Sequence, residues 1–190
     1  MRIYTIGHSN HPLDKFLSLL SQHSIQVLVD VRSHPTSDYA KHFNQSNLNR
    51  EALIAGIKYV YMGKELGGRP ETSDYYDAKR HVRYDQVAQS LTFLQGIERL
   101  RQGIQQFRVA LMCSEEDPAD CHRRLLVGRV LAESGVEVAH IRADGTLQTE
   151  ADLVRLEQPA PERQPQFALF ETTSEYKAWR SVKPIPSASQ

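Results

Sequence analysis

The sequence predicts an α/β fold, namely a three-layer sandwich around a central, mostly parallel, Rossmann-like sheet. Short apolar segments typical of buried strands alternate with longer segments whose apolar residues recur at helical spacing. Parallel strands need crossover connections of this kind, because a tight hairpin joins only antiparallel neighbours. We therefore expect five strands, at residues 3–6, 26–31, 58–62, 108–112 and 136–141.

The predicted helices have their own start and stop signals. Pro12 begins the first helix, since its missing N–H would lack a partner in the first turn anyway. Gly135 ends the helix expected over residues 125–134, because glycine readily adopts the left-handed conformation that follows many helices. Two further helices are expected, around residues 48–55 and over residues 87–101, with a loop over residues 63–80.

The composition limits the classes of partner. The 190 residues carry a formal net charge of zero, so no global field attracts nucleic acid or an anionic membrane. No apolar run approaches the ~18 residues of a membrane span, and two cysteines do not make a disulfide framework. The first residues enter a strand without a signal-peptide core. We expect a cytoplasmic protein with no membrane partner.

Polar residues and glycines stand where several predicted strands end. Because the carboxyl ends of parallel strands meet at one edge of a sheet, and ligands bind there, we expect these residues to form a single site. They are His8 and Ser9 after the first strand, Asp30 and Arg32 at the second, Glu65, Gly67 and Gly68 after the third, and Cys113 after the fourth.

The segment from Cys113 to Arg123 holds both cysteines, a histidine and four acidic residues. A strand that delivers a cysteine into a turn ahead of a helix often exposes a thiolate, the species that attacks substrates. The alternative is a free cysteine buried for packing. We expect Cys113 or Glu115 to act as nucleophile or base and His8 to transfer a proton.

Arginines and glycines at the same edge suggest an anion site. Arg32 and Arg123 are expected to face one crevice, where arginine can grip a phosphate or carboxylate with two hydrogen bonds. The alternative for Arg32 is an ion pair with Asp30, whose unpaired charge would be costly at the end of an apolar strand. Gly67 and Gly68 would let a ligand approach the backbone, unless they only form turns. The predicted substrate-binding set also includes Ser9, Asp30, Glu65 and His122. The chain has no GxGxxG or phosphate-loop pattern, so no cofactor is expected.

A metal could be ligated by Cys113, Cys121 and His122, since zinc takes sulfur and nitrogen ligands. The seven residues between the two cysteines are not a common zinc spacing, and neighbours such as Cys121 and His122 rarely share one ion. From the sequence we therefore predict no bound metal; the candidate ligands are these three, with His8 or His11 as a further one.

Four blocks of sequence, YTIGHS at residues 4–9, DVR at 30–32, LGG at 66–68 and MCSE through CHR at 112–123, resemble the bacterial family filed as "domain of unknown function 488". The likeness covers roughly residues 1–145 and implies an α/β fold but no particular reaction. A more distant likeness, to rhodanese-type sulfurtransferases, rests on LVDVR and on the order of Cys113, Arg123 and the following helix. It implies sulfur transfer at Cys113, although the nine-residue acidic loop before Arg123 departs from a tight anion cradle.

The sequence divides into one domain over residues 1–156 and a proline-rich linker with an appendage over residues 157–190. The segment from Gln164 to Phe170 (QPQFALF) resembles the short peptide by which bacterial DNA-processing proteins dock on the sliding clamp. Its alternative is to pack back on the domain, because three exposed large apolar side chains are unfavourable without a partner.

Taken together, these features favour an enzyme that acts on a small anionic substrate, derived from a nucleotide or nucleic acid. The alternatives are a DNA-maintenance adaptor, with the strand edge as recognition pocket and the tail as clamp peptide, and sulfur transfer at Cys113.

Overall fold

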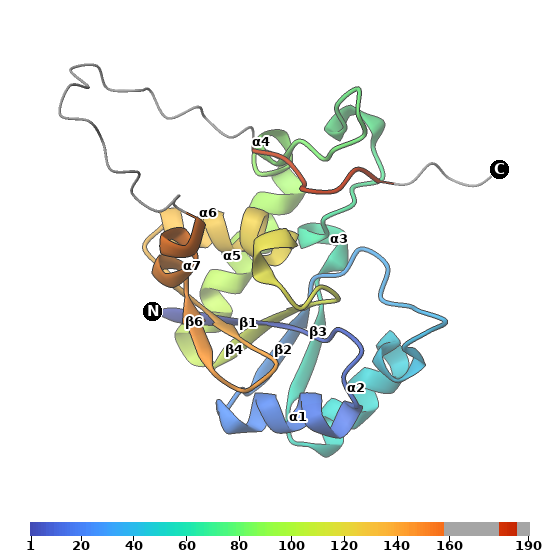
Figure 1. Cartoon of the computed structure of the whole chain (residues 1–190), viewed down its shortest axis with the longest axis vertical. Coiled ribbons are helices and arrows are strands. Elements are labelled where there is room, and N and C mark those ends of the chain that lie inside the picture. The colour runs from blue at the N-terminus through green and yellow to red at the C-terminus, as the bar shows by residue number, and fades with distance from the viewer. Residues whose placement is uncertain (158–178, 186–190) are drawn as a thin grey trace, which may run out of the picture.

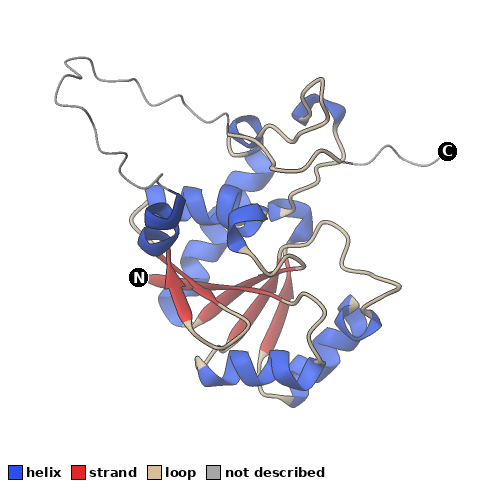
Figure 2. Ribbon diagram, viewed as in Figure 1, coloured by secondary structure: helices blue, strands red, loops and turns tan. Residues whose placement is uncertain are grey.

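The structure, a computed structural model, describes residues 1–157 and 179–185. Within them the chain forms a six-stranded sheet in the order β3-β2-β4-β1-β5-β6 (Figures 1 and 2). Every pairing is parallel except that of β6 with β5. The strands are β1 Arg2–Gly7, β2 Val27–Asp30, β3 Lys58–Tyr61, β4 Val109–Cys113, β5 Glu137–Ile141 and β6 Leu147–Thr149.

Helices cover both faces of the sheet, which makes the predicted three layers (Figure 1). One face packs against α1 and α2, through Phe16 and Leu20 of α1 and Leu48 of α2. The other face packs against α3, α5 and α6, where Phe93 and Leu100 of α5 are buried. The helices are α1 Leu13–Gln22, α2 Gln45–Ile54, α3 Gly63–Leu66, α4 Tyr84–Val87, α5 Leu91–Gln106, α6 Arg129–Glu133 and α7 Glu150–Glu157.

The five predicted strands and the fold class are confirmed, while several short elements were not predicted. α3 is a single turn inside the segment expected to be a loop, and β6 has three residues, so neither is long enough to show a periodic pattern. A π-helical turn, Arg123–Gly128, leads directly into α6, so the helix starts two residues earlier than expected. Turns of this type are frequent at functional sites.

Residues 179–185, which we call the strap, return to the domain near α4. The Ser181 N–H donates to the Val82 carbonyl at 2.9 Å, and the Val82 N–H donates to the Ser181 hydroxyl at 2.9 Å. The Trp179 indole N–H donates to the Leu125 carbonyl at 2.6 Å. This part of the region expected to be an appendage therefore belongs to the packed domain, whereas the clamp-like peptide from Gln164 to Phe170 lies outside the described residues.

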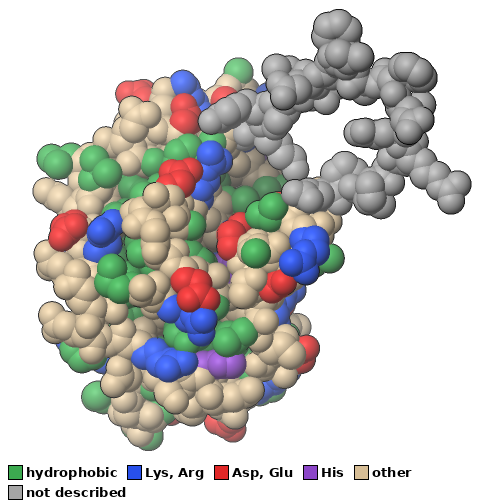
Figure 3. All heavy atoms as spheres, turned by 90° about the vertical axis from the view of Figure 1, so that its left-hand side faces the viewer, with side chains coloured by type: hydrophobic (Ala, Val, Ile, Leu, Met, Phe, Trp, Pro, Cys, Tyr) green, Lys and Arg blue, Asp and Glu red, His purple; other side chains and the backbone are tan. Residues whose placement is uncertain are grey.

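The described residues contain no helix that is both long and apolar enough to cross a bilayer. On the face drawn in Figure 3, side chains of both charge signs are scattered among hydrophobic ones, without a field of one sign. That distribution agrees with the zero net charge of the sequence.

Candidate active site

Cys113 is the last residue of β4, at the centre of the edge where the parallel strands end. β4 lies between β2 and β1, and Cys113 pairs in register with Gly7 of β1. All five residues of β4 are buried, so packing on both faces positions the thiol. The backbone pairing continues past the strand, since the His8 N–H donates to the Cys113 carbonyl at 2.9 Å.

The loop after Cys113 folds back across the end of β1. Gly7 permits this close crossing, because a Cβ on Gly7 would overlap the Glu115 carbonyl oxygen. A short 3-10 turn, Pro118–Asp120, then leads into the helical segment. The glycine at the end of the first strand is thus explained by the approach of another part of the chain.

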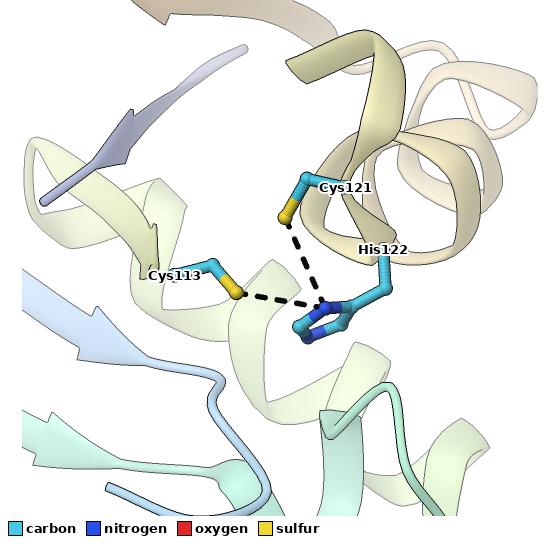
Figure 4. A group of neighbouring side chains, drawn as sticks. All are labelled: Cys113, Cys121 and His122. Atoms are coloured by element: carbon cyan, nitrogen blue, oxygen red, sulfur yellow. Dashed lines mark hydrogen bonds between the residues drawn. The ribbon is translucent and has the colours of Figure 1, made fainter. Parts of the chain in front are cut away.

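Cys113, Cys121 and His122 converge on one point and form what we call the thiol–imidazole cluster (Figure 4). The His122 Nδ1 atom lies 3.6 Å from the Cys113 sulfur and 3.9 Å from the Cys121 sulfur. All three reactive atoms lie within 4.8 Å of one another. The sequence neighbours Cys121 and His122 meet because the backbone changes from extended at Cys121 to helical at His122, which turns both side chains the same way.

The tautomer of His122 follows from its other contact. Its Nε2 lies 2.9 Å from the Val31 carbonyl oxygen, which can only accept, so Nε2 carries the proton. In the neutral ring Nδ1 then has a lone pair, and this lone pair faces the two thiols. Gly68 lies against the ring, because a Cβ there would be 2.5 Å from Cγ of His122. The cluster therefore presents two sulfurs and one basic nitrogen in a set orientation.

The two buried thiols shift each other's pKa in opposite directions. The hydrogen bond with Cys121 and the burial of the thiol hold the pKa of Cys113 well above its usual range. Burial also opposes ionisation of Cys121, but the hydrogen bond with Cys113 and the nearby Arg123 and His122 outweigh it and place the pKa of Cys121 well below its usual range. The shared hydrogen bond and the positive charge of Arg123 therefore favour one thiolate shared within the pair.

Arg32 is held in a buried network at the end of β2. Its Nε donates to one Asp30 oxygen at 2.9 Å and its NH2 to the other at 2.6 Å. The Phe43 carbonyl accepts from the same NH2 at 2.8 Å, and the Tyr59 hydroxyl donates to Asp30 at 2.6 Å. The structure thus has the ion pair between Asp30 and Arg32 that the sequence allowed, and it leaves part of NH1 for a ligand.

His8 contacts this network through both ring nitrogens. Nδ1 lies 2.7 Å from the Ser9 carbonyl, and Nε2 lies 3.2 Å from NH1 of Arg32. The carbonyl can only accept and the guanidinium can only donate, so the ring is neutral with its proton on Nδ1. Burial and the charge of Arg32 lower the pKa of His8 to about 4, from 6.5. Because both nitrogens are engaged, His8 orients Arg32 in this structure and has no position free for proton transfer.

Arg123 lies beneath the loop that follows Cys113 and does not line the pocket described below. Its Nε donates to the Thr5 hydroxyl at 3.2 Å, and its NH2 donates to the Glu116 carbonyl at 2.6 Å. Its NH1 donates to the Glu115 carbonyl. The side chain is 1% exposed, and with three hydrogen bonds to the chain it anchors the loop.

The remaining predicted residues are divided between the site and its surroundings. Glu115 lines the pocket with a half-exposed side chain, 3.9 Å from the Lys183 ammonium. Glu65 does not line the pocket, and it pairs with Arg99 at 3.5 Å. Ser9 adopts a positive φ of 46° and its N–H donates to the Ser114 carbonyl at 2.9 Å. Gly67 allows close contact between backbone segments, because a Cβ there would overlap the Gly63 carbonyl.

A pocket of about 380 Å³, which we call the central pocket, opens at the cluster. The strap forms one wall, and the loop after β2 forms another. Sequence reasoning missed Arg69, Tyr84 and Lys183, which all line it. Arg69 directly follows Gly67 and Gly68, so the glycine motif could have predicted it. No local signal in the sequence could place Lys183 in the same pocket as Cys113. Other lining residues include Arg32, His34, Gly68, Cys113, Glu115, Asp120, Cys121 and His122.

Comparison with known proteins identifies a family but no characterised relative. The model of the family described as "Domain of unknown function DUF488" matches residues 12–130. No curated protein and no solved structure gives a match. The match spans β2, β3 and β4 and includes the whole thiol–imidazole cluster. The chain therefore belongs to the DUF488 family.

Proposed function

We propose that the protein is an enzyme that acts on a small anionic substrate, derived from a nucleotide or nucleic acid, in the central pocket. The observation that carries the proposal is that the cluster and an uncompensated arginine line the same pocket. Cys113, Cys121 and His122 are at the pocket surface, and so is Arg69. Within the described residues, no carboxylate lies within ion-pair distance of the Arg69 guanidinium.

The charges of the pocket support an anion more specifically than the net charge does. Lys183 is balanced by Glu115 and Asp120, each 3.9 Å from its ammonium, and Arg32 is balanced by Asp30. Among the described residues that line the pocket, Arg69 is then the arginine without a carboxylate partner. A planar guanidinium with five donors suits a phosphate or carboxylate group. An anion held there would share the pocket with the cluster.

The cluster supplies the reactive group, and Glu115 is the candidate general base. The His122 nitrogen and the two sulfurs face the substrate space. The Glu115 carboxylate lines the same space and can accept a proton there. Thr5, His8 and Arg123 do not touch the pocket, and we assign them to positioning the loop and Arg32.

A thermal-shift screen of the full chain tests the proposal, using nucleoside mono- and diphosphates, phosphosugars and thiosulfate. A ligand at 100 times its dissociation constant stabilises the folded state by about 2.7 kcal/mol. We expect at least one phosphorylated compound to raise the melting temperature and Arg69→Gln to abolish the shift. Arg99→Gln is the matched control, because Arg99 is exposed on α5 and its ion-pair partner among the described residues is Glu65.

The outcomes separate the three functions. A shift with thiosulfate alone, accompanied by a Cys113 persulfide detected by mass spectrometry, would replace the proposal with sulfur transfer. No response to any compound would remove the enzyme proposal. Binding of single-stranded DNA or of sliding clamp in its place would favour the adaptor, whose docking peptide is outside the described residues.

A further inference from the structure

We propose that the thiol–imidazole cluster is a binding site for a divalent metal ion of the zinc class, ligated by Cys113 Sγ, Cys121 Sγ and His122 Nδ1, with the fourth position open to the central pocket. The inference rests on the proposed function only in placing the metal where the substrate would bind. The sequence spacing argued against a metal, and the folded geometry argues for one.

The distances within the cluster suit tetrahedral zinc. Zinc binds sulfur at about 2.3 Å and nitrogen at about 2.1 Å, so at the tetrahedral angle a sulfur and a nitrogen ligand are roughly 3.6 Å apart. The His122 Nδ1 atom lies 3.6 Å from the Cys113 sulfur and 3.9 Å from the Cys121 sulfur. The two sulfurs lie within 4.8 Å of each other, and an ion bound at the tetrahedral angle would bring them to roughly 3.8 Å.

The surroundings hold His122 in the form that binds metal. A ligating histidine usually donates its other ring N–H to a carbonyl or carboxylate, which sets the tautomer and the ring orientation. Here the Nε2–H donates to the Val31 carbonyl at 2.9 Å, and Gly68 leaves no room for the ring to move in its direction. Both ligating atoms of the neighbouring thiols face the Nδ1 lone pair (Figure 4).

The ligand set also selects the metal. Thiolate and imidazole favour zinc among the common divalent ions, whereas magnesium and calcium require oxygen ligands. Two thiolates would neutralise the charge of the ion, which matters because Cys113 and Cys121 are 7% and 2% exposed. Binding would release the thiol protons to solvent.

The open fourth position makes this a site of the reactive kind. Structural zinc sites are closed by four protein ligands, and catalytic sites keep one position for water or substrate. Among the described residues, the group that can reach the ion has three members, and all three line the central pocket. A water molecule or an anionic substrate atom would complete the coordination, with the carboxylate of Glu115 on the same pocket wall.

The experiment uses the full chain, reduced and purified without chelator. Metal analysis should give one zinc per chain, and exchange for cobalt(II) should produce visible d–d bands together with a thiolate-to-cobalt charge-transfer band. Cys121→Ser and His122→Asn should each weaken zinc binding by more than about 100-fold. Loss of a residue that only hydrogen-bonds to a ligand already lowers metal affinity by about 10–100-fold. His34→Asn, an exposed histidine on the same pocket, is the matched control and should bind zinc like the wild type.

The result that would overturn the inference is a reduced, folded protein that takes up neither zinc nor cobalt. A cobalt spectrum without the charge-transfer band, or unchanged in Cys121→Ser, would overturn it equally. Circular dichroism checks that each variant folds. Because the two variants change different ligands, the test still works if one of them does not fold. Zinc binding without any anion shift would leave the metal site and remove the proposed substrate. If the protein takes up no zinc and an anion still raises its melting temperature, the proposed substrate would stand and the metal site would be removed.

Discussion

Gly68 lies directly against the imidazole of His122, and a Cβ built on it would be 2.5 Å from Cγ and 2.8 Å from Nδ1 of that ring. The glycine after β3 therefore determines where the histidine of the cluster stands. The sequence suggested that Gly68 makes room for a ligand, and in the structure the close neighbour is a side chain of the protein itself.

Gly68→Ala should disturb the cluster more than it disturbs the fold. The added methyl group has to displace the His122 ring from the line between Nδ1 and the two thiols, so zinc or cobalt affinity should fall by at least about 10-fold, as for other outer-partner changes. Gly103→Ala is the control, because nothing lies within 4 Å of a Cβ there. It lies inside α5 and should raise the free energy of unfolding by up to about 1 kcal/mol. Equal metal affinity in wild type and Gly68→Ala would contradict the role of Gly68.

The buried pair of Asp30 and Arg32 predicts a large effect of neutralising the carboxylate. Asp30→Asn leaves Arg32 charged, 4% exposed and without its partner, so the free energy of unfolding should fall by roughly 3–5 kcal/mol. Tyr59→Phe removes one hydrogen bond to the same carboxylate and should cost about 2 kcal/mol. Tyr61→Phe is its control, since that hydroxyl donates at 3.1 Å to a neutral carbonyl, and it should cost about 1 kcal/mol. Urea unfolding measures all three, and equal costs for the two tyrosine variants would refute the charge-assisted bond.

The lowered pKa of His8 predicts a loss of stability in mild acid. The folded-state pKa is about 4 and the unfolded value is 6.5, so between these pH values the unfolded chain binds more protons. The neutral ring therefore contributes its stability fully above pH 6.5, and the contribution is lost as the pH falls toward 4. The difference of about 2.5 pH units corresponds to roughly 3 kcal/mol.

His8→Asn tests this assignment by removing the titrating group. The difference in free energy of unfolding between wild type and variant should shrink as the pH falls from 6.5 to 4. The measurement uses chelator-treated protein, so that release of a metal in acid does not contribute. His34→Asn, in an exposed loop, shows what the loss of any histidine does. A wild-type advantage that stays constant over this range would mean that His8 is not held neutral.

The local sequence pattern predicted much of the fold, but it did not predict much of the candidate site. The apolar run over Val109–Cys113 predicted a buried strand. The parallel sheet then predicted that Cys113 lies at the edge where the strands end. Asp30 and Arg32 could be paired because they are two residues apart at the end of a buried strand. These predictions depend on neighbours in the sequence or on the rules of parallel sheets.

The features of the site that the sequence did not predict depend on contacts between distant segments. Arg123 and His8 are residue types that suit catalysis. The folded structure shows that Arg123 already donates to the Glu115 carbonyl, and that His8 already contacts Arg32. Lys183 reaches Glu115 across 68 positions of sequence (183 minus 115). No local periodicity encodes such a return of the chain, so the strap could not be predicted from the sequence.

The role of Arg123 as an anchor predicts a change in the loop and not only in stability. Arg123→Met keeps the aliphatic stem but leaves the Glu115 and Glu116 carbonyls without their donor, at a cost of about 1–3 kcal/mol for each unsatisfied group. The loop should open, so the backbone amides of the loop should exchange faster with deuterium. Arg124→Met is the control, because Arg124 pairs with Glu150 and Glu157 away from the loop. If both variants speed amide exchange in this loop equally, Arg123 acts only through global stability.

The strap provides its own reporter, because Trp179 is the only tryptophan of the chain. Its indole N–H donates to the Leu125 carbonyl at 2.6 Å, and the Arg129 guanidinium lies 4.4 Å above its ring. Tryptophan emission therefore follows the docking of the strap, while circular dichroism follows the whole fold. Ser181→Ala removes the hydroxyl that accepts from the Val82 N–H and leaves that buried donor unpaired. The strap should then detach before the domain unfolds, so that the emission midpoint moves to lower urea than the circular-dichroism midpoint. Ser73→Ala, on an exposed turn, should leave the two midpoints as they are in the wild type. Coincident midpoints in Ser181→Ala would show that the strap and the domain unfold as one unit, and that the wall of the central pocket which the strap forms does not open separately.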